Sequence, residues 1–133
     1  MAHPNEELLR KGYADFGRGD VNAYLDVCDS NFAFTVPGQS RVAGRYVGRA
    51  EFLGMVGKVM EACGGSFQEE VHDVLANDTH GLVLAVHRFT RDGIQREYNT
   101  AHLYHIQAGR LMECWELPES QAQFDEAWGS ASG

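Results

Sequence analysis

Two histidines and a glutamate in the second half of the chain carry groups that could exchange protons with a bound molecule. His87, His102 and Glu116 stand in three separate strand-like segments. An imidazole has a reference pKa of about 6.5, so it can give up or take a proton near neutral pH. A neighbouring carboxylate could orient the ring, or act as the base itself if burial raises its pKa. These residue types favour general acid–base chemistry. Two other interpretations stay open: two histidines and one carboxylate match a common metal-ligand set, and a buried histidine is often only a hydrogen-bonded core residue.

The elements that would position these side chains follow from the hydrophobic spacing. Amphipathic stripes predict three N-terminal helices and a short C-terminal one. The expected N-caps are Asn5 and Asp20, and Gly64-Gly65 ends the third helix. Alternating patterns and the turn signals Asp92-Gly93 and Ala108-Gly109 predict strands after them. The helices are expected over about 5–17, 21–28, 48–63 and 119–128, and the strands over 32–36, near Tyr46, and over 67–76, 82–91, 94–107 and 110–117. Helices followed by a strand meander predict an α+β fold, in which a curved antiparallel sheet wraps three N-terminal helices and encloses a pocket.

Composition narrows the class of protein. The chain has 133 residues, with 11 Lys and Arg against 19 Asp and Glu, which gives a formal net charge of −8. This excess argues against a nucleic-acid partner and against docking on an anionic membrane. We expect one domain over residues 1–128 and a flexible tail over 129–133. The absence of a signal-like or membrane-spanning stretch, together with Cys28, Cys63 and Cys114 in no CxxC pair, predicts reduced thiols in the cytoplasm.

An ordered set of short motifs adds a family resemblance. The segments are Gly19-Asp20, Val36-Pro37-Gly38-Gln39-Ser40, Ala43-Gly44-Arg45-Tyr46-Val47-Gly48, Val71-His72-Asp73-Val74, Arg91-Asp92-Gly93 and Trp115-Glu116-Leu117-Pro118. Together, over about residues 6–128, they resemble the SnoaL-like branch of the NTF2-like superfamily. That resemblance implies the cone-shaped fold of ketosteroid isomerase. It does not imply one reaction, because the fold hosts isomerases, cyclases, hydrolases, dehydratases and proteins without catalytic activity.

The ketosteroid isomerase resemblance indicates which positions face the cone. The position of its aspartate base is Val36 here, its tyrosine donor falls near Gly12, one residue from Tyr13, and its protonated aspartic acid corresponds to His102. The chain therefore departs from the isomerase pattern at its catalytic positions, and His102 or Glu116 would have to carry the chemistry. The Asp-Arg-Asp set of limonene epoxide hydrolase, another relative, is not found on matching strands.

Strand alternation extends this assignment from His102 to its neighbours. If His102 points inward, so do Tyr98 and Tyr104 on the same strand, while Glu69 is expected to point outward. A β-bulge would invert any of these positions. We predict His102, Glu116 and His87 as catalytic candidates, and a substrate-binding lining of Tyr13, Phe16, Val36, Met55, Phe89, Tyr98, Tyr104, Met112 and Cys114.

The leading expectation is an enzyme that performs isomerisation or cyclisation on an apolar, carbonyl-bearing or polyketide-like metabolite. Such acid–base chemistry needs neither a metal nor another cofactor. One alternative is a non-catalytic small-molecule binding protein with the same cone. Others are an epoxide hydrolase or dehydratase-type member, or a protein–protein adaptor. The resemblance also implies a homodimer formed through the outer face of the sheet.

Overall fold

The first three helices form where the sequence predicts amphipathic segments. In the computed structural model, which describes residues 2–130, they are α1 (Pro4–Gly17), α2 (Val21–Asp26) and α3 (Gly48–Cys63). Asp20 caps α2 as expected, by accepting a hydrogen bond from the Ala23 amide. Asn5 is not the cap of α1. His3 is the cap, and the buried Asn5 side chain instead donates to the Asn77 carbonyl, 2.9 Å away.

Six strands form one curved sheet in the order β2-β1-β6-β5-β4-β3. Their bounds are β1 Cys28–Val36, β2 Gly44–Val47, β3 Gln68–Ala76, β4 His80–Arg91, β5 Ile94–Gln107 and β6 Arg110–Pro118. All neighbours pair antiparallel except β1 and β6, which are parallel. The turns Asp92-Gly93 and Ala108-Gly109 have positive φ at both residues, as tight two-residue hairpin turns require. The predicted α+β fold is therefore confirmed.

The predicted boundary between α2 and β1 is wrong. The helical stripe from Val21 predicts a helix that continues to Cys28, but α2 ends at Asp26 and Cys28 already belongs to β1. Cys28 pairs with Leu111 of β6, and the Leu111 amide donates to the Val27 carbonyl at 2.9 Å. Pairing across the sheet thus overrides a short helix that has little stability of its own.

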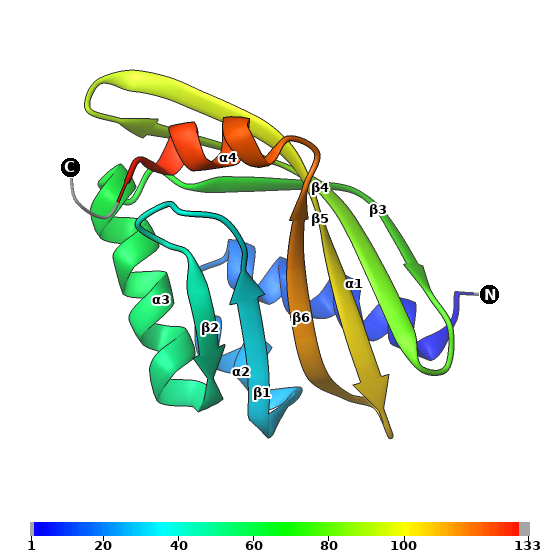
Figure 1. Cartoon of the computed structure of the whole chain (residues 1–133). Helices are drawn as coiled ribbons and strands as arrows, with labels where there is room; N and C mark the ends of the chain where they lie inside the picture. The colour runs from blue at the N-terminus through cyan, green and yellow to red at the C-terminus, as the bar shows by residue number, and fades with distance from the viewer. Residues whose placement is uncertain (1, 131–133) are drawn as a thin grey trace.

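Helices and sheet together enclose the interior of the molecule. Figure 1 shows α1 lying across one face of the sheet and α3 beside β1 and β2. It shows α4 (Gln121–Trp128) at the end of the sheet where β6 stops. The guanidinium of Arg91 holds the end of α4 by donating to the Ala127 carbonyl. Gly129 and Ser130 pair with Arg41 and Ser40, and residues 131–133 of the expected tail lie outside the described residues. Over residues 2–130, no helix has the length and apolar character needed to cross a membrane.

Candidate functional site

A cavity of about 70 Å³ lies between the helices and the concave face of the sheet. Its aromatic and aliphatic lining comes mainly from α1, α2, α3, β1 and α4, and its histidine and glutamate side chains come from β3 to β6. The apolar and aromatic lining is Tyr13, Phe16, Tyr24, Phe34, Val36, Val42, Phe52, Met55, Val56, Val59, Phe67, Tyr98, Phe124 and Trp128; the ionisable lining is Glu69, His87, His102 and Glu116. A mainly apolar cavity with a few convergent polar groups is the usual form of a small-molecule site.

His102 and Glu116 form a buried pair on the floor of this cavity. They face each other across β5 and β6, and His102 Nε2 lies 2.9 Å from Glu116 Oε1. The second carboxylate oxygen accepts a hydrogen bond from the Thr100 hydroxyl. Because an ionised carboxylate only accepts hydrogen bonds, Nε2 of His102 carries the hydrogen and its Nδ1 faces the other side of the ring.

The other nitrogen of His102 meets a chain of tyrosine hydroxyls. The hydroxyl of Tyr13 lies 2.5 Å from His102 Nδ1 and 2.6 Å from the Tyr104 hydroxyl, which is 2.8 Å from that of Tyr24. With a neutral His102, every hydroxyl can donate toward the imidazole: Tyr24 to Tyr104, Tyr104 to Tyr13, and Tyr13 to Nδ1. Burial raises the pKa of the Tyr13 phenol well above its ordinary value, so Tyr13 remains a hydroxyl donor near neutral pH.

Opposing effects set the charge states of His102 and Glu116. Burial lowers the pKa of His102, but the charge and hydrogen bond of Glu116 and the charge of Glu69 outweigh burial and raise this pKa above its usual value. Burial likewise tends to raise the pKa of Glu116, but His102, His87 and the Thr100 hydrogen bond bring it below its usual value. The pair therefore favours an imidazolium beside a carboxylate, which is a proton donor held in place by a fixed negative charge.

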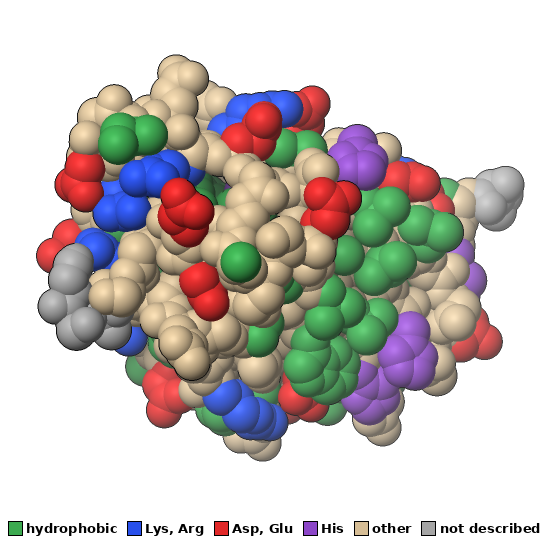
Figure 2. All heavy atoms as spheres, turned by 45° about the horizontal axis from the view of Figure 1, so that its top comes forward, with side chains coloured by type: hydrophobic (Ala, Val, Ile, Leu, Met, Phe, Trp, Pro, Cys, Tyr) green, Lys and Arg blue, Asp and Glu red, His purple; other side chains and the backbone are tan. Residues whose placement is uncertain are grey.

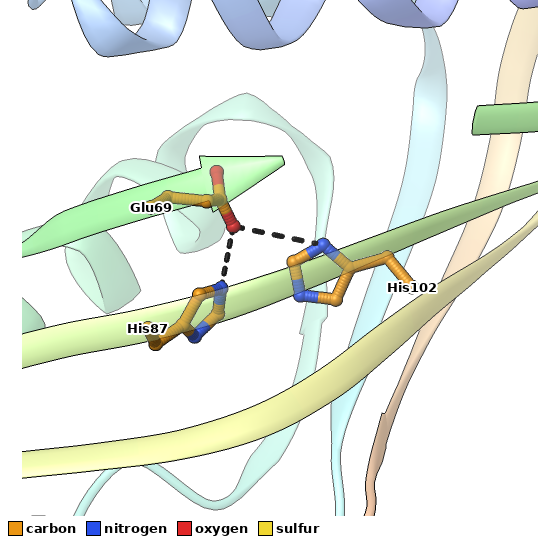
Figure 3. Close-up of side chains that lie close together, drawn as sticks. All are labelled: Glu69, His87 and His102. Atoms are coloured by element: carbon orange, nitrogen blue, oxygen red, sulfur yellow. Dashed lines mark hydrogen bonds and ion pairs between the residues drawn. The ribbon is translucent and has the colours of Figure 1, made fainter. Parts of the chain in front are cut away.

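A second histidine–carboxylate pair lies next to the first, on β4 and β3. His87 Nε2 is 2.6 Å from Glu69 Oε2, and the same oxygen is 3.9 Å from His102 Nδ1. The other ring nitrogen of His87 is 2.9 Å from the Tyr98 hydroxyl, which accepts a hydrogen bond from the Trp128 indole. Figure 3 shows Glu69 reaching from the edge strand toward both imidazoles, so this carboxylate joins the two pairs into one cluster.

Glu69 is the residue of the cluster that sequence reasoning missed, and its expected outward orientation is wrong. Its side chain is only 12% exposed and points toward the cavity. The signal is present in the sequence: Phe67, two positions earlier, is apolar and shares the same face, as alternation requires. A glutamate on an edge strand resembles an ordinary solvated residue unless that neighbour is considered.

Most of the predicted lining residues do face the cavity. His87, His102 and Glu116 all line it, with Tyr13, Phe16, Val36, Met55 and Tyr98 around them. Four predicted lining residues do not reach it. The hydroxyl of Tyr104 is covered by those of Tyr13 and Tyr24. Its cross-strand partner Cys114 is fully buried with it. Phe89 lies behind Trp128, whose ring stacks on it with centroids 3.9 Å apart.

Met112 is the fourth, and a β-bulge explains it. The register between β5 and β6 shifts so that Ile106 faces Leu111 while His105 faces Glu113. The extra residue is Met112, which inverts the alternation on that side of the bulge. Leu111, fully buried, takes the inward position that was expected for Met112.

The sequence leaves open a metal-ligand set of His87, His102 and Glu116, and the structure gathers a different one. Glu116 hydrogen-bonds to Nε2 of His102, whereas the potential ligand atoms that lie together are Glu69 Oε2, His87 Nε2 and His102 Nδ1, all within 4.8 Å of one another. The two histidines of that alternative are present in this group, with Glu69 in place of Glu116.

The order of elements, the curved six-stranded sheet and the enclosed cavity define an NTF2-like fold. The family model of the SnoaL-like domain matches residues 9–114, so the chain belongs to the SnoaL-like family.

Several proteins are similar to this chain over nearly its whole length. An uncharacterized protein of Mycobacterium tuberculosis (strain ATCC 25618 / H37Rv) is 28% identical over 124 residues, which are 92% of this chain and 94% of the relative. The structure of Bal32a, from a soil-derived mobile gene cassette, is similar at a TM-score of 0.89 with 27% identity, covering 96% of this chain and 98% of Bal32a. TerC, co-crystallized with polyporic acid, has a TM-score of 0.83 and 18% identity, covering 94% and 98%. At that identity, the likeness to TerC concerns the fold.

Proposed function

We propose that the protein is a small-molecule enzyme that performs acid–base chemistry, an isomerisation or cyclisation, on an apolar carbonyl-bearing metabolite. The observation that carries the proposal is the arrangement of His102 between the Glu116 carboxylate and the Tyr13 hydroxyl, at the wall of an apolar cavity. Family membership supports a small-molecule substrate. The capture of polyporic acid by TerC, which has the same fold, is consistent with an organic ligand in this cone.

The cluster contains the two kinds of group that a proton shift needs. One group must donate to the carbonyl oxygen as charge develops there, and Tyr13 or the imidazolium of His102 can do so. Another must take a proton from carbon, and the pair of Glu69 and His87 lies on the neighbouring strands for that role. The His87 and His102 ring centroids are 5.5 Å apart, so both groups can reach one small molecule. Glu116 orients His102 and balances its charge.

The volume of the cavity limits which substrates can enter without movement of the protein. An engineered apolar cavity of about 150 Å³ accommodates benzene, whereas this cavity is about 70 Å³. A ring-sized ligand therefore requires lining side chains to move. Met55 lines the cavity from α3 and has the side chain best suited to yield, because methionine is unbranched and flexible.

Deuterium exchange next to a carbonyl tests this proposal without knowledge of the natural product. A graded series of ketones, from acetone to cyclohexanone and bicyclic ketones, is incubated with EDTA-treated protein in D₂O and followed by NMR. We expect the wild type to deuterate at least one ketone at the α-carbon. His102→Ala and Tyr13→Phe should each slow this exchange by about 100-fold or more, in the range of positioned proton transfer.

His105→Ala is the matched control, because His105 is on the same strand but its position points to the outer face of the sheet. That variant should exchange ketones at the wild-type rate. The proposal fails if no ketone exchanges faster than with heat-denatured protein. It also fails if His102→Ala, folded by circular dichroism, keeps the full rate.

A binding protein without catalysis is the second candidate, and one observation favours it. Each ionisable group of the cavity already has a partner inside the protein: Glu69 pairs with His87, and Glu116 with His102. A cluster whose groups are all paired in this way needs no catalytic role, because it can stabilise the fold and shape a pocket. Native mass spectrometry after mild purification separates the two candidates, because a carrier retains its ligand unchanged while an enzyme releases product.

We also propose that a second copy of the chain covers the outer face of the sheet. Figure 2 shows hydrophobic side chains gathered over these strands, next to histidines. Cross-strand pairing places Leu82, Leu103 and Trp115 in one row, and the nearby Leu117 is 46% exposed. Light scattering after size exclusion should give twice the chain mass for the wild type and for Leu53→Glu, on the exposed side of α3. It should give the monomer mass for Leu117→Glu; a wild-type monomer contradicts the proposal.

A further inference from the structure

The nitrogens of two histidines and one carboxylate oxygen converge at a single point of the cavity wall. Glu69 Oε2 lies 2.6 Å from His87 Nε2 and 3.9 Å from His102 Nδ1, and the three atoms are all within 4.8 Å of one another. Ligand atoms around a tetrahedral zinc ion, each about 2.0–2.2 Å from the metal, are roughly 3.3 Å apart. Small shifts of three side chains would therefore reach metal-binding distances.

Each imidazole has a hydrogen-bond partner at the ring nitrogen that points away from Glu69. That partner can hold the ring with its other nitrogen available to a metal. His102 donates through Nε2 to the Glu116 carboxylate, which leaves Nδ1 as the nitrogen directed at Glu69. Glu116 is itself fixed by the Thr100 hydroxyl. Histidine ligands of metals usually donate their other ring hydrogen to a carboxylate or carbonyl in this manner, which fixes the tautomer and the ring orientation.

His87 has an equivalent arrangement with a hydroxyl in place of the carboxylate. Its Nδ1 is 2.9 Å from the Tyr98 hydroxyl, whose position is fixed by the Trp128 indole. A hydroxyl can donate or accept, so it supports either tautomer of His87. Without an ion, His87 Nε2 donates to Glu69; with one, Nδ1 donates to Tyr98 and Nε2 offers its lone pair.

The charges around the site also favour a cation. The ion pairs that Glu69 and Glu116 form within residues 2–130 are all with histidines, whose positive charge depends on protonation. A divalent ion placed between Glu69 and the two neutral imidazoles would balance both carboxylates. Buried charges are normally paired or coordinate a metal, because isolation from water is unfavourable.

We propose that Glu69, His87 and His102 bind a divalent transition-metal ion of the zinc class, with a coordination position open to the cavity. Three protein ligands, two histidines and one glutamate, with an open position are typical of catalytic zinc sites. The inference goes beyond the acid–base function and does not rest on it. An ion on His102 Nδ1 would displace the Tyr13 hydroxyl, which could then hydrogen-bond to a metal-bound water.

Metal titration of EDTA-treated protein tests the site directly. Calorimetry with zinc sulfate should show one saturable ion per chain, and cobalt chloride should produce the intense visible absorption of a low-coordinate Co²⁺ complex. Glu69→Gln and His87→Ala should each lower the affinity by more than 100-fold. Glu116→Gln, which changes the hydrogen-bond partner of His102 and leaves the three proposed ligands in place, should lower the affinity by about 10- to 100-fold.

The exposed His80 and the half-buried His105 provide the control, because their rings lie 5.7 Å apart on the outside of the sheet and could bind metal adventitiously. The double substitution His80→Ala/His105→Ala should leave the tight site intact. The proposal is overturned if zinc does not bind, or if binding survives Glu69→Gln and disappears with the outer histidines. Glu69 is on an edge strand and partly exposed, so Glu69→Gln should fold even if His87→Ala does not. These readouts measure binding alone, so their failure is distinct from failure of the ketone assay on metal-free protein.

Discussion

The close approach of α1 to β4 at Gly81 gives a sharp test of how the fold positions the site. A Cβ atom on Gly81 would lie 2.4 Å from Leu9 Cδ1 and 3.2 Å from Ile106 Cδ1. Leu9 and Ile106 are both fully buried, so neither side chain has free space to move into. Tyr13 stands one helical turn after Leu9 on α1, and its hydroxyl must reach His102. Gly81→Ala should therefore push α1 outward and disturb both packing and the site.

The size of the destabilisation follows from the overlap between the new Cβ atom and the Leu9 side chain. Carbon atoms in contact prefer about 3.5–4.0 Å, so the Leu9 contact must open by more than about 1 Å. Overpacking of this kind costs about 1–3 kcal/mol. Replacing glycine restricts the unfolded chain and returns about 0.4–1 kcal/mol. We expect Gly81→Ala to lower the free energy of unfolding by about 1–2 kcal/mol, which in a chain of this size lowers Tm by about 3–8 °C.

Urea and thermal unfolding followed by circular dichroism provide the assay. Gly57→Ala is the control, because Gly57 is exposed in the middle of α3 and a Cβ atom there would have no heavy atom within 4 Å. That variant should stabilise the protein by about 0.5–1 kcal/mol. In the double variant Leu9→Ala/Gly81→Ala, the new methyl enters space vacated by Leu9. The double variant should therefore be more stable than the sum of the single effects, by about 0.5–3 kcal/mol. Strict additivity, or a Gly81→Ala protein as stable as wild type, would refute the reasoning.

Three further predictions concern buried groups. The pKa of Glu116 is below its ordinary 4.5 and that of His102 is above its ordinary 6.5. Both groups are therefore charged between pH 4.5 and 6.5, and Glu116→Gln should lower the free energy of unfolding most in this pH range. This loss should become smaller as pH falls and Glu116 protonates, and also as pH rises and His102 deprotonates. Urea titrations at several pH values measure the loss, and a loss that stays constant across pH would contradict the prediction. Tyr98→Phe leaves the Trp128 indole without its acceptor and should cost about 1–3 kcal/mol in the same assay; an unchanged midpoint would count against that hydrogen bond. Burial raises the pKa of Cys28 to about 12, so iodoacetamide at pH 8 should label it only as the chain unfolds, and rapid labelling of native protein, seen by mass spectrometry, would show that the thiol is accessible.

The parts of the fold that the sequence predicts best are those set by local chemistry. Asp92-Gly93 adopts the positive φ angles that its residues favour, and it fixes the register of β4 against β5. From that register, and with His102 placed inward by the family resemblance, alternation puts His87 and Tyr98 on the inner face as well. One anchored residue thus determines most of the site, provided the strands remain regular.

The errors arise where long-range contacts interrupt this regularity. No residue near Met112 signals the bulge in the sequence, because the bulge depends on how β6 pairs with both β5 and β1. Cys28 has helical spacing from Val21, yet its partner Leu111 lies far along the chain and draws it into a strand. An outward Glu69 is expected because charged residues on an edge strand are normally solvated, whereas here two imidazoles compensate its burial.

The parallel pairing of β1 with β6 has a consequence for how the chain can fold. β1 and its hairpin partner β2 belong to the first half of the chain, but the other neighbour of β1 is β6, the last of the six strands along the sequence. Until β6 emerges from the ribosome, the aromatic side chains of β1 and α3 have no sheet to cover, and non-local closure of this kind is slow. The meander from β3 to β6 can form by successive local hairpins, so we expect it to precede β1 docking. The cavity would then be completed in the final step of folding.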